Sequence, residues 1–176
     1  RRRRKNNSVS GDVPFMSVLD MFAGSGCIGI ALLKHLPNVH VDFVDISPNC
    51  IRQIKKNCAL NSIPSERFRI VQSDMFDSLK DAFYDLIVAN PPYVGMRTAD
   101  KRLDTSARVF EPHAALFSGE DGLDHIHRFL REAPKRLASG GTIAMEFDDI
   151  QKDSIEKFLL ENSSGIATFH HDQYGS

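Results

Sequence analysis

Cysteine is scarce in this sequence, and the few cysteines show no spacing that suggests disulfide pairs. The 176 residues contain Cys27, Cys50 and Cys58, an odd number without C-x-x-C spacing. Such usage is typical of a reducing compartment and argues against a disulfide framework. The histidines show no metal-ligand pattern either, because His125 and His127 are two residues apart and would point to different faces of a helix. We therefore expect no metal site.

Long apolar runs and a strong net charge are also missing. No stretch approaches the roughly 18 to 20 apolar residues that span a bilayer, and no secretory signal pattern is present. The net charge of −1 argues against a broad nucleic-acid surface, although residues 1–5 form a basic run. We expect a soluble, intracellular monomer, mitochondrial or cytoplasmic, with a basic flexible leader over residues 1–12 and one domain over 13–176.

Short apolar runs alternate with amphipathic stretches along most of the chain. Strands are predicted over residues 17–22, 39–44, 68–72, 84–89 and 142–147, with a sixth beginning over 165–170, and helices over 30–36, 49–60, 123–137 and 150–161. Ser47-Pro48 marks a helix start, Pro134 should kink or restart a helix, and Gly140-Gly141 should turn the chain into the fifth strand. This alternation predicts an α/β fold with a doubly wound, mostly parallel sheet.

A glycine-rich turn follows the first predicted strand. Gly24, Gly26 and Gly29 have the G-x-G-x-x-G spacing of a nucleotide-binding turn, where glycine lets the backbone approach a ligand closely. Asp45 ends the second strand, 21 residues after Gly24, and is placed to accept hydrogen bonds from ribose hydroxyls. These features fit a site for NAD as well as one for S-adenosylmethionine.

The third strand closes on Ser73-Asp74-Met75-Phe76. An acidic residue beside an apolar pair suits an adenine, with Asp74 accepting from the exocyclic amino group and Met75 or Phe76 packing against the ring. Asp74 as an ordinary turn or N-cap residue is the alternative interpretation.

Asn90-Pro91-Pro92-Tyr93 directly follows the fourth predicted strand. Two prolines fix φ and remove two backbone donors, so the loop offers carbonyl acceptors at fixed positions. An NH₂ group on an amide or a base edge would donate one hydrogen to the Asn90 side chain and the other to the Pro91 carbonyl, with Tyr93 as an aromatic wall. A strand that simply stops and turns at Pro-Pro is the alternative.

These motifs together carry a family resemblance. Residues from about 17 to 151 resemble the catalytic domain of the class I, S-adenosylmethionine-dependent methyltransferases, and specifically the HemK-type protein glutamine methyltransferases. The matching segments are 19–20 with 24–28, then 44–47, 73–76, 90–94, 110–112 with 115–116, 119–123, and Glu146 with Gln151. The motif at 90–93 is shared with enzymes that methylate amino groups of adenine in DNA and guanine in RNA. Its combination with Glu111-Pro112 and segment 119–123 favours the protein-methylating branch.

The resemblance implies transfer of a methyl group from S-adenosylmethionine to the glutamine amide in the Gly-Gly-Gln loop of a class 1 translation release factor. It also implies a Rossmann-like sheet of seven strands, the last of which would be missing here. The predicted cofactor contacts are Asp20, Phe22, Gly24, Gly26, Cys27, Asp45, Ile46, Asp74, Met75 and Asn90. The predicted substrate contacts are Asn90, Pro91, Pro92, Tyr93 and Glu111, with Asn90, Pro91 and Tyr93 as catalytic residues.

The chain also departs from the family pattern. The helical domain that precedes the family's catalytic domain has no match here, and Phe22-Ala23 stand where family members usually have Gly-Thr. We therefore expect a truncated or incompletely covered catalytic domain. Residues 95–108 are expected to form a flap over the substrate or a simple surface loop. Glu111 would hold that flap or the Asn90 loop, or cap the next turn, and Glu146 would lie near the pocket; neither is expected to be catalytic.

Two other functions stay open at this point. A nucleic-acid amino methyltransferase would use the same Asn90 and Pro91 acceptors to hold a flipped base, on which Tyr93 would stack. A non-enzymatic or NAD-dependent nucleotide-binding domain would leave the motif at 90–93 without a role. Cys27 is expected to be a small packing residue at a helix start rather than a nucleophile.

Overall fold

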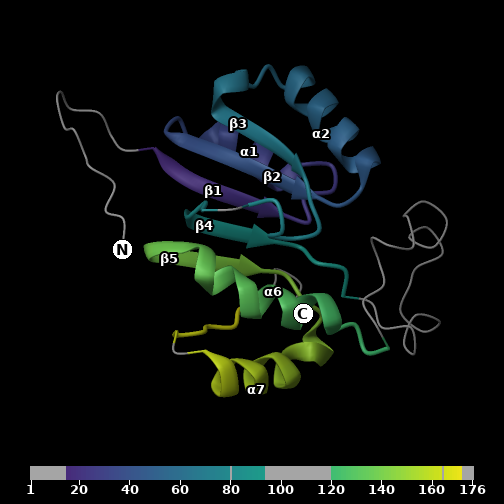
Figure 1. Cartoon of the computed structure of the whole chain (residues 1–176), viewed down its shortest axis with the longest axis vertical. Helices are drawn as coiled ribbons and strands as arrows, with labels where there is room; N and C mark the ends of the chain where they lie inside the picture. Colours follow the sequence, from purple (N-terminus) through teal and green to yellow (C-terminus); the bar gives the residue numbers. More distant parts are fainter. Residues whose placement is uncertain (1–14, 80, 94–119, 164, 172–176) are drawn as a thin grey trace.

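The fold is an α/β sandwich around a parallel sheet (Figure 1). The computed structural model describes residues 15–79, 81–93, 120–163 and 165–171. In these residues the strands are β1 (Met16–Met21), β2 (Val39–Asp45), β3 (Phe68–Gln72), β4 (Tyr84–Ala89) and β5 (Leu137–Met145). They form one five-stranded sheet in the order β3-β2-β1-β4-β5, with every neighbouring pair parallel. The predicted doubly wound parallel sheet is confirmed at five strands.

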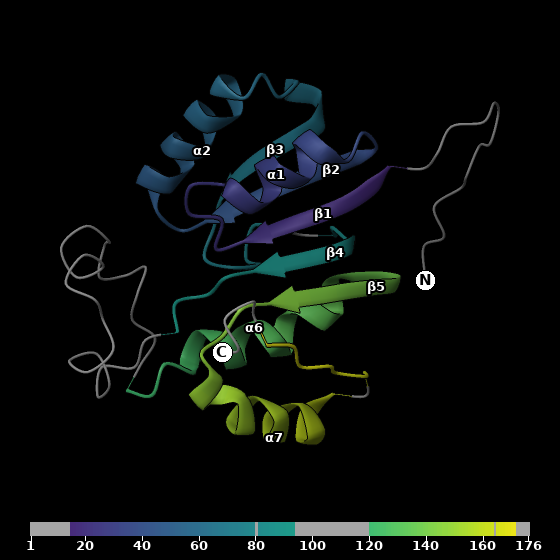
Figure 2. The same ribbon diagram turned by 180° about the vertical axis from the view of Figure 1, so that it is seen from behind.

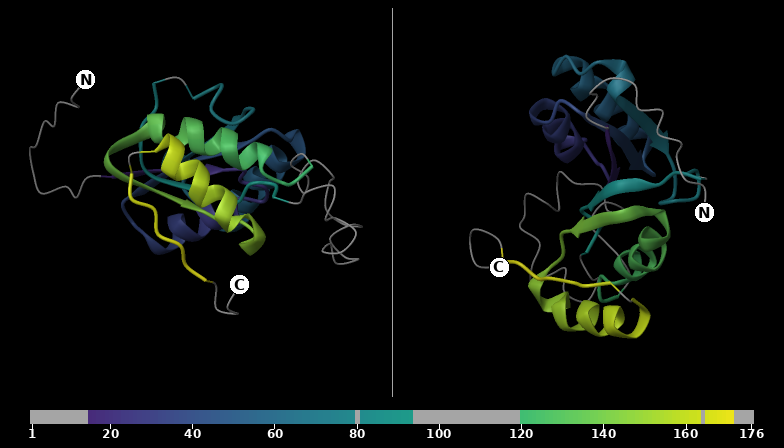
Figure 3. Two further views of the ribbon diagram at one scale, coloured as in Figure 1. Left: turned by 90° about the horizontal axis from the view of Figure 1, so that it is seen from below. Right: turned by 90° about the vertical axis from the view of Figure 1, so that its left-hand side faces the viewer.

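Helices cover both faces of the sheet, and each face has its own core (Figure 3). On one face, α1 (Cys27–His35) and α2 (Pro48–Leu60) bury Ile30, Leu33 and Ile54 against Val41 and Phe43. On the other face, α6 (Asp124–Glu132) buries Phe129 against residues of β1 and β4. The helix α7 (Lys152–Asn162) packs against α6 through Ile126 and Ile155. Strand residues alternate between the two cores, as a sheet buried on both faces requires.

Short 3₁₀ segments complete the described elements. They are η1 (Ser65–Arg67), η2 (Ala133–Arg136) and η3 (Asp149–Gln151). Proline at position 134 ends the predicted helix, because α6 stops at Glu132 and continues only as η2. No helix among the described residues is long and apolar enough to cross a membrane.

Two predicted details are wrong. Gly140 and Gly141 do not turn the chain into a strand, since β5 already begins at Leu137 and passes through both glycines; its register with β4 shifts between Tyr84 and Leu86. Residues 165–170 form no strand. Ile166 is 99% exposed there, so the apolar alternation that suggested a strand buries nothing at this position.

The carboxyl ends of all five strands lie at one edge of the sheet (Figure 2). β1 has β2 on one side and β4 on the other, so the strand order reverses between β1 and β4. Ligands of open α/β sheets bind outside the carboxyl ends at such a reversal. The site is therefore expected where β1 and β4 end.

Candidate active site

The register of the sheet brings the predicted motifs together. Met21 at the end of β1 pairs with Val44 of β2 and with Ala89 of β4, and Ala89 in turn pairs with Met145 of β5. The segments that follow these strands therefore lie side by side at one edge. The loop that starts at Asn90 therefore lies beside the glycine turn that follows β1, although the two segments are more than 60 residues apart in the sequence.

Asp45 holds the glycine turn from the neighbouring strand. Its Oδ2 accepts from the Gly24 N–H at 2.9 Å, and its Oδ1 accepts from the Ser47 N–H at 2.8 Å. Gly24 and Gly26 both have positive φ, of 54° and 79°, which glycine adopts at low cost. Next to Asp45, Ile46 is 60% exposed and presents an apolar side chain at the tip of β2. The end of β2 thus offers a carboxylate at Asp45 and, next to it, an exposed apolar side chain at Ile46.

Asp20 lies beneath the turn. It is 2% exposed, and its Oδ2 accepts from the Gly29 N–H at 2.9 Å in the first turn of α1. Burial raises the pKa of Asp20 to about 7; the Gly29 hydrogen bond lowers it and the charge on Asp45 raises it further. A Cβ on Gly29 would lie 2.3 Å from Phe43 Cε1, so only glycine allows this approach. In this structure Asp20 therefore holds the first turn of α1 in place through its hydrogen bond with Gly29.

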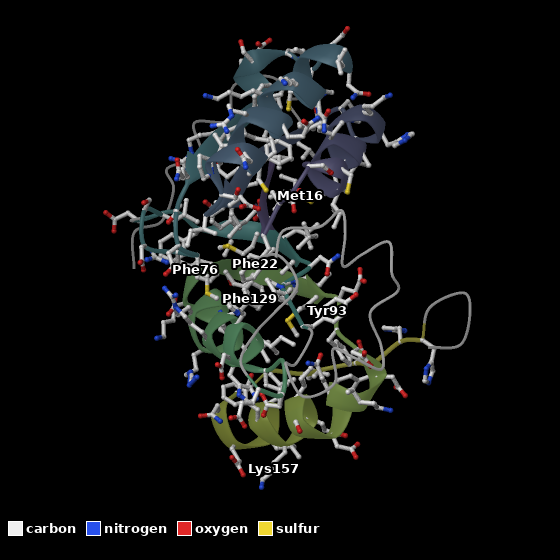
Figure 4. All side chains as sticks on the ribbon, turned by 90° about the vertical axis from the view of Figure 1, so that its right-hand side faces the viewer. Met16, Phe22, Phe76, Tyr93, Phe129 and Lys157 are labelled. Atoms are coloured by element: carbon white, nitrogen blue, oxygen red, sulfur yellow. The ribbon has the colours of Figure 1, made fainter. Side chains whose placement is uncertain are left out.

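Phe22 and Met75 take backbone conformations that non-glycine residues rarely adopt. Their φ angles are 58° and 45°, and both follow strands at the carboxyl edge. Phe22 packs on Phe129 at 6.1 Å between ring centroids, and Phe76 stacks on Phe129 at 6.0 Å (Figure 4). Met75 is 3% exposed, so it belongs to the core beneath the edge. Residues held in such conformations cluster at functional sites.

Asp74 is paired with a residue that the sequence patterns did not single out. Arg128 Nη1 on α6 donates to Asp74 Oδ1 at 2.7 Å, and the same guanidinium lies 3.5 Å from Asp77 and 3.3 Å from Glu132. The hydrogen bond with Asp74 is the main cause that raises the pKa of Arg128. The turn predicted to face adenine is thereby tied to α6.

The Asn90 loop is held at both ends. At its start, the Glu146 N–H donates to the Ala89 carbonyl at 3.0 Å. At its end, Gln151 Nε2 donates to the Tyr93 carbonyl at 2.9 Å. Between these points Asn90 is exposed, Pro91 is buried, and Pro92 and Tyr93 are half-buried. The motif thus lies at the carboxyl end of β4, where the sequence predicted it, and the structure adds that its amide is exposed and its loop is held at both ends.

Some further predictions need comment. Cys27 is exposed at the first position of α1, so the expectation that it packs at the helix start is wrong; Gly29 and Ile30 face the sheet instead. Glu111 and the segment 95–108 lie outside the described residues. Within the described part of the chain, no group of three or more histidine, cysteine, aspartate or glutamate side chains could hold a metal ion.

Comparison with known proteins places the chain in a family. A family model described as the methyltransferase small domain matches residues 9–119. The chain belongs to that family. It is 39% identical over 160 residues to the release factor glutamine methyltransferase of Rhodopirellula baltica, covering 90% of this chain and 53% of that protein. It is 40% identical over 138 residues to the ribosomal protein uL3 glutamine methyltransferase of Francisella tularensis, covering 77% of this chain and 42% of that protein.

The chain thus spans about half the length of these two curated methyltransferases. Its fold is also that of solved methyltransferases. The ribosomal protein L11 methylase from Lactobacillus delbrueckii subsp. bulgaricus superposes with a TM-score of 0.58 at 23% identity, over 85% of this chain and 61% of that one. At this identity the likeness establishes a methyltransferase Rossmann-like fold.

Proposed function

We propose that this chain carries the catalytic part of an S-adenosylmethionine-dependent protein glutamine methyltransferase, and that its substrate is the Gly-Gly-Gln glutamine of a class 1 translation release factor. The observation that carries the proposal is the exposed Asn90 on a clamped Pro-Pro loop, beside the glycine turn at the strand reversal. Relatives named for release factor and for uL3 glutamine methylation support glutamine as the acceptor. The release factor is the more specific half of the proposal.

The residues around the glycine turn fit the proposed cofactor. A carboxylate offers about four acceptor positions, and main-chain N–H groups use two of them at Asp45, so the others suit two ribose hydroxyls. Gly24 and Gly26 allow close approach of the backbone, and exposed Ile46 offers an apolar surface beside an adenine. When bound, the cofactor would supply a methyl group on a sulfonium that is already activated for attack.

The chain's own residues would then orient the acceptor. A glutamine amide is a poor nucleophile because its lone pair is delocalised. If the Asn90 side-chain oxygen and the Pro91 carbonyl accept its two N–H groups, electron density on the nitrogen increases and the amide is aligned for in-line transfer. These hydrogen bonds strengthen as positive charge builds on the nitrogen, so they favour the transition state over the ground state. Tyr93 would shield the reacting atoms from water.

No general base is needed in this scheme. The amide nitrogen becomes acidic only after it has received the methyl group, so its proton can leave to water afterwards. Asp20, the titratable group with the strongly raised pKa near the turn, is buried and bound to Gly29, which suits it to support of α1 rather than to proton transfer.

The test uses the full-length protein with methyl-labelled S-adenosylmethionine. A class 1 release factor, its Gly-Gly-Ala variant, ribosomal protein uL3 and structured RNA or duplex DNA are offered in parallel. Label on the release factor alone, lost in the Gly-Gly-Ala variant, is expected. Label on uL3 alone would keep glutamine chemistry and overturn the release factor. Label on nucleic acid alone would overturn the protein-methylating function and favour base flipping.

The variant Asn90→Ala tests whether orientation of the substrate amide is separate from cofactor binding. Turnover should fall by about two orders of magnitude, the order expected when a preorganised hydrogen bond to the reacting group is removed. Affinity for S-adenosylmethionine, measured by thermal shift, should change little. Asn162→Ala is the matched control, because Asn162 lies at the exposed end of α7 and donates to the Phe158 carbonyl. An equal loss of cofactor binding in Asn90→Ala would refute this division of roles.

A further inference from the structure

Gln151 is a buried amide whose nitrogen and oxygen are both hydrogen-bonded, and one of these bonds is to the end of the Asn90 loop. Its side chain is 2% exposed at the end of η3. Nε2 donates to the Tyr93 carbonyl at 2.9 Å and to the Asp121 carbonyl at 3.4 Å, while Oε1 accepts from the Asp148 N–H at 3.2 Å. Two carbonyls on one side and an N–H on the other determine which way the amide is oriented. The position therefore needs a side chain that donates at one end and accepts at the other, as a glutamine amide does.

Gly122 also packs closely against the Tyr93 carbonyl. Its φ is 83°, and a Cβ there would lie 2.1 Å from the Tyr93 oxygen and 2.7 Å from Gln151 Nε2. The segment before α6 thus rests directly against the Tyr93 peptide. The Tyr93 carbonyl is held by a hydrogen bond and by close packing together.

This contact completes the immobilisation of the loop. Ala89 is fixed by β4 and by the N–H of Glu146, and the rings of Pro91 and Pro92 fix their φ angles. Tyr93 is the last residue of this loop that the structure describes, and its carbonyl lies against Gln151 and Gly122. If its carbonyl rotated, the Tyr93 end of the Pro-Pro segment would lose this contact, and the direction of the Pro91 carbonyl would be less restricted.

We propose that Gln151 is a positioning residue for methyl transfer: by holding the Tyr93 carbonyl, with Gly122 against it, Gln151 fixes the Pro91 carbonyl and the Asn90 side chain that accept the substrate amide. The inference rests on the proposed function. Gln151 contacts neither substrate nor cofactor in this scheme. Its loss should therefore lower kcat and leave cofactor affinity unchanged, because Asp45 and the glycine turn are held by other contacts.

The sharpest test is Gln151→Glu, which keeps the shape and exchanges the donor for an acid. As a carboxylate, the new side chain would face two carbonyl oxygens and repel them; as a neutral acid, its O–H would donate to Tyr93 as the amide does. Burial among carbonyls raises a glutamate pKa. The variant should approach the wild-type kcat at low pH and lose about tenfold or more as pH rises. Gln151→Met lacks a donor at every pH, so its kcat relative to wild type should be low and flat.

Two further variants complete the comparison. Gly122→Ala should reproduce the kcat loss, since its Cβ would displace the Tyr93 carbonyl. Gln53→Glu is the matched control, because Gln53 is an exposed glutamine on α2 that donates to Asn57. It should keep both the wild-type kcat and the wild-type pH profile. Thermal shift with S-adenosylmethionine shows for each variant that the protein is folded and binds the cofactor.

A substrate-independent measurement separates this inference from the proposed function. Hydrogen exchange of the peptide that contains residues 90–93 should be faster in Gln151→Met than in wild type, and unchanged in Gln53→Glu. If wild type labels no glutamine but hydrogen exchange of residues 90–93 is faster in Gln151→Met, the proposed function fails, while the conclusion that Gln151 holds the Asn90 loop is supported. If wild type labels glutamine and Gln151→Glu keeps the wild-type kcat and pH profile, the inference is overturned. Equal exchange in wild type and Gln151→Met would also overturn it.

Discussion

Arg128 joins the turn after β3 to α6 through Asp74. The guanidinium donates to the Asp74 carboxylate at 2.7 Å and lies near Asp77 and Glu132 at 3.5 and 3.3 Å. The same helix carries Phe129 against Phe22, and the turn before it touches Tyr93 through Gly122. This helix and the turn before it therefore contact the turns after β1 and β3 and the loop after β4, which are the three parts of the proposed site.

Arg128→Met should weaken cofactor binding. The pair is about one-third to one-half exposed, with side-chain exposures of 35% and 49%. Such pairs contribute about 0.2–1 kcal/mol, so we expect the Kd for S-adenosylmethionine to rise at most about fivefold. Isothermal titration calorimetry would measure the change. Arg131→Met is the control, because that guanidinium lies over the ring of Phe158 on α7. An unchanged Kd in Arg128→Met would mean that Asp74 needs no support from α6.

Asp20→Asn should flatten the pH dependence of stability. The folded protein raises the pKa of Asp20 from 3.8 to about 7, so the folded state binds the proton more tightly than the unfolded state. The resulting stability is complete below about pH 4 and is lost as pH rises through about 7. The free energy of unfolding should therefore fall from pH 4 to pH 8 with a slope of at most about 1.4 kcal/mol per pH unit from this group.

Urea unfolding at several pH values would measure this slope. In Asp20→Asn the contribution should disappear, since the asparagine oxygen can still accept from Gly29 but no longer titrates. Asp124→Asn, at an exposed position of α6, should keep the wild-type dependence. The explanation fails if wild type and Asp20→Asn show the same slope.

Local patterns predicted the elements that matter most for the site. β3 and β4 have the predicted bounds, because each is a short apolar run with clear stops. The glycine turn, Asp45 and the Asn90 loop meet at one edge because parallel strands bring their carboxyl ends together. Local patterns gave wrong predictions at Gly140-Gly141 and over residues 165–170. The strand β5 includes Gly140 and Gly141 where its register with β4 shifts, between the pairs Tyr84–Leu137 and Leu86–Thr142, whereas residues 165–170 leave Ile166 almost fully exposed and form no strand.

The contacts that support the site were not predictable in this way. Gln151 and Tyr93 are 58 residues apart, and Arg128 and Asp74 are 54 apart. Neither pair follows a helical or strand period, since each joins a helix or turn to a loop from another part of the chain. Only the family resemblance points to Gln151 in the sequence. Its three hydrogen bonds are known only from the fold.

Gly29→Ala should destabilise the protein and weaken cofactor binding together. The new Cβ would lie 2.3 and 2.8 Å from two atoms of the Phe43 ring and 2.9 Å from Asp20 Oδ2. Overpacking of this kind costs about 1–3 kcal/mol, and the displaced first turn of α1 would carry the glycine turn with it. Urea unfolding and calorimetry would measure the two effects. Gly165→Ala is the control, with its nearest contact at 3.4 Å. Normal stability of Gly29→Ala would show that α1 shifts freely.

Tyr84→Phe should destabilise the protein and leave the site intact. The hydroxyl of Tyr84, which is 1% exposed, donates to Asp42 Oδ2 at 2.8 Å, and Arg69 also binds that carboxylate. Removing the hydroxyl leaves a buried carboxylate with one donor fewer, which costs about 1–3 kcal/mol. Arg69→Met should cost less, because the Arg69 side chain is 51% exposed and water can replace it. Urea unfolding would rank the two variants, and calorimetry should find the wild-type Kd for S-adenosylmethionine in both. A larger loss from Arg69→Met would mean that the ion pair, rather than the buried hydroxyl, stabilises Asp42 inside the sheet.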